Sequence, residues 1–234
     1  MAERFVIDDI PVELHCHDQR RTRIGMNIDP GGFVVLDAPA STGYEEVEEI
    51  VRQHGRWLKY RVRKIQEETA HLGKLSLKTG ELVAYLGSAL ELRQHAGAGT
   101  LIEGGVLYVP EGDDEAVKAA VRTWYRERAK EAFTEVFESY VFLPWLAEVK
   151  PRWRQRFLRR RWGSCSDRGE ITLNTHLVRT PLRLIEYVVL HELCHLVHRD
   201  HSRRFHALLS QYMDDWQERS AELGKNVGLL LDDF

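Results

Sequence analysis

Short hydrophobic runs in the first part of the chain are separated by residues that favour turns. The runs occupy residues 5–7, 12–17, 24–28 and 33–36. Between them lie Asp8-Asp9 and the segment Asp29-Pro30-Gly31-Gly32, both of which are typical of tight turns. We therefore predict four short strands, with residues 29–32 forming a hairpin loop.

A helical pattern follows, because hydrophobic residues now recur three and four positions apart. They are Val47, Ile50 and Val51. Acidic residues gather at the start of this pattern, where the helix dipole favours them, and Ser41 or Thr42 is the expected N-cap. Gly55 indicates a break, after which a second helix should run to about residue 71.

The pattern then returns to strands, which we predict at residues 81–86, 89–95, 101–102 and 106–109. Gly87-Ser88 and Gly104-Gly105 are suited to tight two-residue turns. Residues 110–114 combine turn residues with a change to helical periodicity. They predict a boundary between an N-terminal β-rich domain with a helix pair (residues 1–110) and a second domain (residues 111–234).

The second domain begins with a long helical pattern, at residues 114–141. Residues 150–166 favour a strand followed by a turn, and a second strand is expected at residues 171–174. Thr180-Pro181 should cap a buried helix, with proline at its first position. A last helix should run from Ser202 to Gly224. The predicted fold class is therefore α+β, with a long helix, a small sheet and a buried helix in the second domain.

Composition excludes few classes of protein. The chain has 234 residues, a formal net charge of −3 and 43% hydrophobic residues, which is ordinary for a globular protein. No apolar run approaches the ~18 residues of a membrane span, and the acidic start lacks the apolar core of a signal peptide. Three scattered cysteines (Cys16, Cys165 and Cys194) indicate reduced thiols, so we expect a cytoplasmic location. No internal repeat stands out.

The buried helix carries the most specific chemical pattern in the chain, His191-Glu192-Leu193-Cys194-His195. Residues four apart lie on one face of an α-helix, so His191 and His195 can bind one Zn²⁺. Glu192 need not be a ligand and is placed to take a proton from water on the metal. This arrangement predicts a zinc-dependent hydrolase with Glu192 as its base.

The third zinc ligand must come from further along the chain. His198 lies on the same helix face but roughly 10 Å along the axis from His191, too far for one ion. His201 can reach the ion if the helix ends near residues 199–200, and we favour it. Carboxylates on the next helix are the alternative, namely Asp214, Asp215, Glu218 and Glu222.

Several segments together resemble the YgjP-like metallopeptidase family. They are Trp162-Gly163-Ser164-Cys165-Ser166, residues 169–174, the helix with the histidine motif, His201-Ser202 and Phe205, and at the front of the chain residues 20–37, Trp57 and Tyr85-Leu86-Gly87. The chain more distantly resembles the SprT and WLM groups, some members of which act on proteins crosslinked to DNA.

The resemblance implies a zincin-like core, with zinc between a small sheet, a long helix and the helix of the motif. It supports His191, His195 and His201 as ligands and Glu192 as the base, in a peptidase acting on a protein or peptide. Zincins bind a peptide along a strand near the metal. The resemblance therefore implies a substrate-binding role for Ile171, Leu173 and Asn174, with His176 close by.

Residues 150–161 form a basic stretch interleaved with Trp153 and Phe157. Its cations are Lys150, Arg152, Arg154, Arg156, Arg159, Arg160 and Arg161. Two interpretations stay open: a nucleic-acid surface, or a strand face whose arginines pair with acids of the 114–138 segment.

Two alternatives to a simple peptidase also remain. One is a zinc-stabilised module that binds protein or nucleic acid, and the other is a DNA-associated protease of the SprT kind.

Overall fold

The computed structural model describes residues 2–17, 23–29, 31–69, 75–147 and 151–232. The chain divides into two compact units, Met1–Gly73 and Lys74–Phe234. This division differs from the expected boundary at residues 110/111, which falls inside the second unit. The strands before residue 110 share one hydrophobic core with the helix that follows them, and this core holds them in the second unit.

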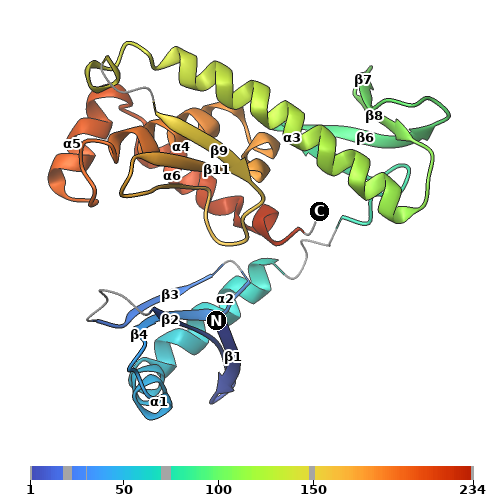
Figure 1. The fold of residues 1–234 in the computed structure, drawn as a ribbon. Helices are drawn as coiled ribbons and strands as arrows, with labels where there is room; N and C mark the ends of the chain where they lie inside the picture. The colour runs from blue at the N-terminus through green and yellow to red at the C-terminus, as the bar shows by residue number, and fades with distance from the viewer. Residues whose placement is uncertain (1, 18–22, 30, 70–74, 148–150, 233–234) are drawn as a thin grey trace. The chain divides into compact units, whose positions relative to one another are not determined.

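Unit 1 is a four-stranded sheet packed against two helices (Figure 1). The strands are β1 (Ala2–Ile7), β2 (Ile10–His17), β3 (Gly25–Ile28) and β4 (Val34–Pro39), in the order β1-β2-β4-β3. The helices are α1 (Tyr44–Gln53) and α2 (Gly55–Thr69). All four predicted strands and the helix pair are confirmed, but the N-cap of α1 is Gly43 and not Ser41 or Thr42.

Unit 2 begins with a second four-stranded sheet, which packs on the long helix α3 (Asp114–Ser139). Its strands are β5 (Leu82–Tyr85), β6 (Ser88–His95), β7 (Leu101–Glu103) and β8 (Val106–Pro110), in the order β5-β6-β8-β7. The side chain of Asp113 caps α3 by accepting a hydrogen bond from the N–H of Ala116. Buried Tyr125 of α3 donates a hydrogen bond to the carbonyl of Ala84.

The two four-stranded sheets share one topology, although the sequence analysis found no repeat. In each, a parallel central pair is flanked by antiparallel outer strands. The equivalent turns Asp8-Asp9 and Leu86-Gly87 both have two residues with positive φ. Aligned on these turns, residues 12–17 (VELHCH) match 90–95 (LELRQH), and 34–39 (VVLDAP) match 105–110 (GVLYVP). The chain therefore contains two copies of one four-stranded motif, each followed by a helix.

The second sheet of unit 2 has three strands. They are β9 (Arg152–Arg156), β10 (Gly163–Cys165) and β11 (Glu170–Asn174), in the order β10-β11-β9. The predicted strands in segments 150–166 and 171–174 are confirmed as β9 and β11. Strand β10 was expected to be a turn, because Gly-Ser-Cys shows no hydrophobic alternation. Trp153 of β9 stacks on Phe137 of α3, so the inner face of this sheet also packs on the long helix.

The remaining helices surround the buried helix α4 (Leu182–Cys194) (Figure 1). They are the 3₁₀ helices η1 (Pro144–Leu146), η2 (Thr175–Arg179) and η3 (Val227–Leu231), and the α-helices α5 (Arg203–Tyr212) and α6 (Trp216–Lys225). Pro181 is the N-cap of α4 and not its first residue, since its ψ of 142° is outside the helical range. Thr180 does not cap the helix, because its hydroxyl donates to the carbonyl of Leu177. The single helix predicted for 202–224 is two helices, because Met213 adopts an extended conformation between them.

The α+β fold class is confirmed, with small sheets and six α-helices among the described residues. None of the described helices combines the length and the apolar character that crossing a membrane requires.

Candidate metal centre

The histidine motif lies where α4 ends. His191 and Glu192 are in its last turn, and His195 directly follows Cys194, the last helical residue. The N–H of His198 bonds to the carbonyl of Cys194 at 2.9 Å and closes a turn. Helix α4 ends at Cys194, several residues before the predicted break at 199–200, and His198 no longer belongs to its face.

The early end of α4 allows the chain to turn back, and it brings His201 to the other two histidines. One nitrogen of each imidazole lies within 4.8 Å of the others, and Nε2 of His201 is 3.0 Å from Nε2 of His191. Within the described part of the chain, this is the one group of at least three His, Cys, Asp or Glu side chains with metal-binding spacing. The three histidines predicted as ligands are thus in one place.

Phe205 of α5 packs against the rings of all three histidines. It is fully buried, and its ring centroid lies 4.9 Å from His191, 4.6 Å from His195 and 4.9 Å from His201. In the sequence, Phe205 stands out only as part of the resemblance to the YgjP-like family. No pattern in one sequence separates such a support from an ordinary core residue.

His195 is oriented by the backbone. Its Nδ1 lies 3.0 Å from the carbonyl oxygen of His198, the geometry of an N–H donating to that oxygen. This bond directs Nε2 toward the other two rings, as second partners of metal-binding histidines commonly do. His198 therefore acts at the site through its backbone and not through its imidazole.

The three histidines fit a metal ion that binds neutral imidazole. Burial lowers the pKa of His191 to about 3, with smaller contributions from His195 and His201, and burial also lowers the pKa of His195. Both rings are thus neutral near pH 7, and metal binding needs no proton to leave them. Three nitrogens with room for a further ligand match the ligand set of catalytic zinc.

Glu192 is only 5% exposed and lies against the edge of the three-stranded sheet. Burial raises its pKa to about 8, while the positive charge of Arg161 acts in the opposite direction. Its Oε2 atom has no hydrogen-bond partner among the described residues. A buried carboxyl with a free oxygen is unusual in a structural role and is suited to accepting and releasing a proton.

Gly163 of β10 makes this position of Glu192 sterically allowed. A Cβ atom on Gly163 would lie 2.6 Å from Oε1 of Glu192 and 3.0 Å from its Cγ and Cδ. Any other residue would displace the carboxyl group. In the sequence, Gly163 belongs to a segment that resembles the YgjP-like family, but nothing there indicates its contact with Glu192.

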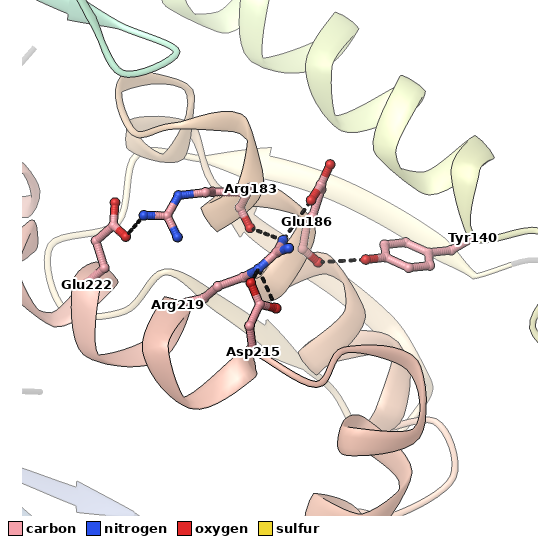
Figure 2. A network of polar contacts seen from close by, with 6 residues as sticks. All are labelled: Tyr140, Arg183, Glu186, Asp215, Arg219 and Glu222. Atoms are coloured by element: carbon pink, nitrogen blue, oxygen red, sulfur yellow. Dashed lines mark hydrogen bonds and ion pairs between the residues drawn. The ribbon is translucent and has the colours of Figure 1, made fainter.

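Two of the four alternative carboxylate ligands serve a different purpose. Asp215 and Glu222 belong to a polar network between α4 and α6 that also includes Arg183, Glu186 and Arg219 (Figure 2). Asp214 and Glu218 are exposed, and neither joins the histidine cluster. Among the described residues, His201 is the third side chain of the group.

Two hollows share Gly163, His191 and Glu192 in their lining. One of about 310 Å³ is largely apolar, and Tyr187, Val188 and Leu223 contribute to its lining. The other, of about 290 Å³, includes Asp167, Arg199 and the other two histidines. Arg199 donates hydrogen bonds to the carbonyls of Ser166 and Asp167, and it thereby fixes the turn between β10 and β11.

The three residues predicted to bind substrate, Ile171, Leu173 and Asn174, lie inside the three-stranded sheet. They lie on β11, the central strand, whose backbone pairs with β10 on one side and β9 on the other. All three side chains are fully buried. A central strand has no free backbone edge for a peptide, and short apolar runs do not reveal which strand lies at the edge.

The side chains of Asn174 and His176 make contacts within the fold. The amide of Asn174 donates to the carbonyls of Leu158 and Arg161 and so holds the loop that leads to β10. His176 is buried beside Phe157 and Arg179, and burial lowers its pKa to about 3. Neither side chain lines the two hollows.

Strand β10 is the edge strand of this sheet that lies beside the histidines. The N–H of Asn174 bonds to the carbonyl of Trp162, and that of Ser166 bonds to the carbonyl of Glu170. Antiparallel pairs alternate along a ladder, so Gly163 and Cys165 direct their N–H and C=O groups away from β11. Both residues line the polar hollow beside the histidines.

Comparison with known proteins gives one match. The family model for the YgjP-like metallopeptidase domain matches residues 22–226, a range that includes parts of both units. No curated protein and no solved structure matches the chain significantly. Since the match covers most of the chain, the protein belongs to the YgjP-like family of metallopeptidase domains.

Proposed function

We propose that this protein is a zinc-dependent peptidase that hydrolyses peptide bonds in a protein or peptide. The observation that carries the proposal is the meeting of His191, His195 and His201 beside the buried, unpartnered carboxyl of Glu192. Zinc is the metal we propose, because three imidazoles are a common ligand set for catalytic zinc. Membership of a metallopeptidase family supports the reaction class.

Zinc held by these histidines would supply Lewis-acid chemistry that makes water nucleophilic near neutral pH. Glu192 is the general base that takes the proton from the attacking water at its free Oε2 atom. The same carboxyl then delivers a proton to the nitrogen of the departing amine. Burial raises the pKa of Glu192 and so strengthens its carboxylate as a proton acceptor.

The substrate peptide lies extended along β10 in this proposal. The outward N–H and C=O groups of Gly163 and Cys165 pair with its backbone, as in binding by strand addition. Side chains on either side of the scissile bond then enter the apolar hollow beside Tyr187 or the polar hollow beside Arg199. Backbone pairing tolerates many sequences, so the hollows set the preference.

The substitution Glu192→Gln tests the mechanism. It keeps the size of the side chain and removes the proton acceptor, so it should retain zinc and lower kcat by about 10²–10⁴-fold. Zinc content by atomic absorption and cleavage of a fluorogenic peptide library measure the two effects. Glu218→Gln, on exposed α6, is the matched control and should keep both. Normal turnover by Glu192→Gln would disprove the assigned role.

The second hypothesis is a zinc-stabilised binding module without peptidase activity. A structural zinc site is closed by four protein ligands. In the parts of the chain that the structure describes, the cluster has three members and opens into a hollow, which favours the enzyme. We also propose a cytoplasmic location, because Cys16, Cys165 and Cys194 are all unpaired thiols.

A further inference from the structure

Helix α2 uses only a narrow part of its surface to pack on unit 1. Leu58 and Val62, one turn apart, are its two buried side chains among those described. They join the core beneath the unit 1 sheet. Most of this helix therefore faces solvent and is not required for packing.

The solvent face of α2 carries an unusual combination of charges and aromatic rings. Its exposed side chains between residues 56 and 64 are Arg56, Trp57, Lys59, Tyr60, Arg61, Arg63 and Lys64. The sequence has no acidic residue from Gly55 to Gln66. We call this set the α2 face. Because the whole chain has a net charge of −3, the five cations of the α2 face are a local concentration of positive charge.

Four of these five cations have weak ion pairs or none among the described residues. Lys59 lies 4.0 Å from Asp9, whose carboxylate is almost fully exposed, and Arg63 lies 3.6 Å from Glu67. Exposed pairs of this kind are weak and easily exchanged for other anions. Arg56 and Arg61 have no ion pair with any residue that the structure describes.

The two aromatic rings are exposed among these cations. The side chains of Trp57 and Tyr60 are 53% and 55% exposed, and residues three apart are neighbours on a helix surface. A hollow of about 420 Å³ beside Tyr60 is lined by the cations Arg56, Lys59 and Arg63, together with Asp9 and Val62. Rings with accessible faces thus lie next to groups that bind anions.

We propose that the α2 face binds single-stranded nucleic acid. Arginine and lysine attract phosphates, and exposed aromatic rings stack with bases, a combination typical of sequence-tolerant single-strand binding. A membrane is a poorer fit, because an interfacial helix needs a broad apolar face, and the aliphatic residues Leu58 and Val62 of α2 are already buried in unit 1. The proposal does not depend on the metal centre, which lies in unit 2.

Binding of the full-length protein to a labelled oligothymidylate of roughly 12 nucleotides tests the proposal, with fluorescence anisotropy as the readout. The double variant Trp57→Ala/Tyr60→Ala should bind at least about fivefold more weakly, since stacking on one base contributes ~1–3 kcal/mol. An abasic oligomer of the same length has the same charge but no bases. Its affinity should be unchanged by this variant.

The double variant Arg56→Gln/Arg61→Gln should act differently. Each lost phosphate contact lowers the slope of log K against log salt by about 0.7 for single strands, so the slope should fall by about 1.4. The abasic oligomer should show the same reduction, because this effect depends on phosphates alone. Circular dichroism checks that α2 remains folded in every variant.

The matched control is Arg152→Gln/Arg154→Gln on β9, where two exposed arginines offer the alternative basic surface. This control should bind the oligomer like the unchanged protein. The proposal is overturned if the oligomer fails to bind at low salt, if the α2 variants bind normally, or if the β9 variant alone loses binding. Tighter binding to phosphatidylserine vesicles than to the oligomer would also overturn it.

Discussion

At the scale of single residues, Gly163 controls how closely the sheet approaches Glu192. The carboxyl group occupies the space that a Cβ atom at position 163 would fill. The same residue presents its backbone N–H and C=O along the open edge of β10. One glycine therefore combines two requirements, a close approach to the proposed base and a free backbone for the substrate.

Replacing Gly163 with alanine should lower kcat on the order of 10–100-fold, because a displacement of about 1 Å at a reacting group has costs of this size. Zinc content should not change, since the atoms nearest to the added methyl group belong to Glu192, which is not a proposed zinc ligand. Peptide cleavage and metal analysis together measure the effect. Gly43→Ala, where a Cβ atom meets nothing within 4 Å, is the control. An unchanged kcat for Gly163→Ala would contradict the proposed position of Glu192.

The sequence predicted some residues of the site and could not predict others. His191, Glu192 and His195 follow from helix periodicity, and His201 follows from the need for a third ligand within reach. Gly163 and Phe205 act through contacts between segments far apart in the chain. Such contacts exist only in the folded molecule, so local patterns do not contain them.

At the scale of elements, the end of α4 and the polar network around α6 shape the centre. The predicted helix extended to residue 198, because Leu196 and Val197 continue the apolar spacing. In the structure α4 stops at Cys194, and Val197 is exposed. Arg219 of α6 bonds to Glu186 and to the carbonyl of Arg183 on α4, and to Asp215 beside its own helix (Figure 2). This network holds α6 where Leu223 lines the apolar hollow.

The substitution Arg219→Gln should lower the free energy of unfolding by about 1–3 kcal/mol, because it removes a charged donor that serves three acceptors. Arg183→Gln is a matched control within the same network. Arg183 is nearly half exposed and pairs with Glu222 alone, so its loss should change stability by at most about 1 kcal/mol. Urea unfolding measured by tryptophan fluorescence compares the two. Equal effects would show that the network does not hold α6.

At the scale of the whole molecule, a repeated motif explains why the predicted boundary differs from the observed one. Residues 110–114 carry strong turn signals, but in both copies of the motif such a turn joins the last strand to its helix. Residues 39–43 (PASTG) occupy the equivalent place in unit 1. Six of the twelve residues matched in the central strands are identical, but the repeat becomes evident only when strand pairing aligns the two copies. Each unit has its own hydrophobic core.

Because the two units have separate hydrophobic cores, the same substitution at equivalent positions should destabilise only the unit that contains it. Leu14 in β2 and Leu92 in β6 match in the repeat, and both are buried. Replacing either with alanine should cost about 2–5 kcal/mol through the cavity it leaves. Leu14→Ala should speed amide hydrogen exchange within residues 2–69 and leave zinc affinity unchanged. Leu92 shares a core with Leu193 and Phe205, so Leu92→Ala should speed exchange in unit 2 and weaken zinc binding. Identical exchange patterns in the two variants would mean that the molecule unfolds as one cooperative body.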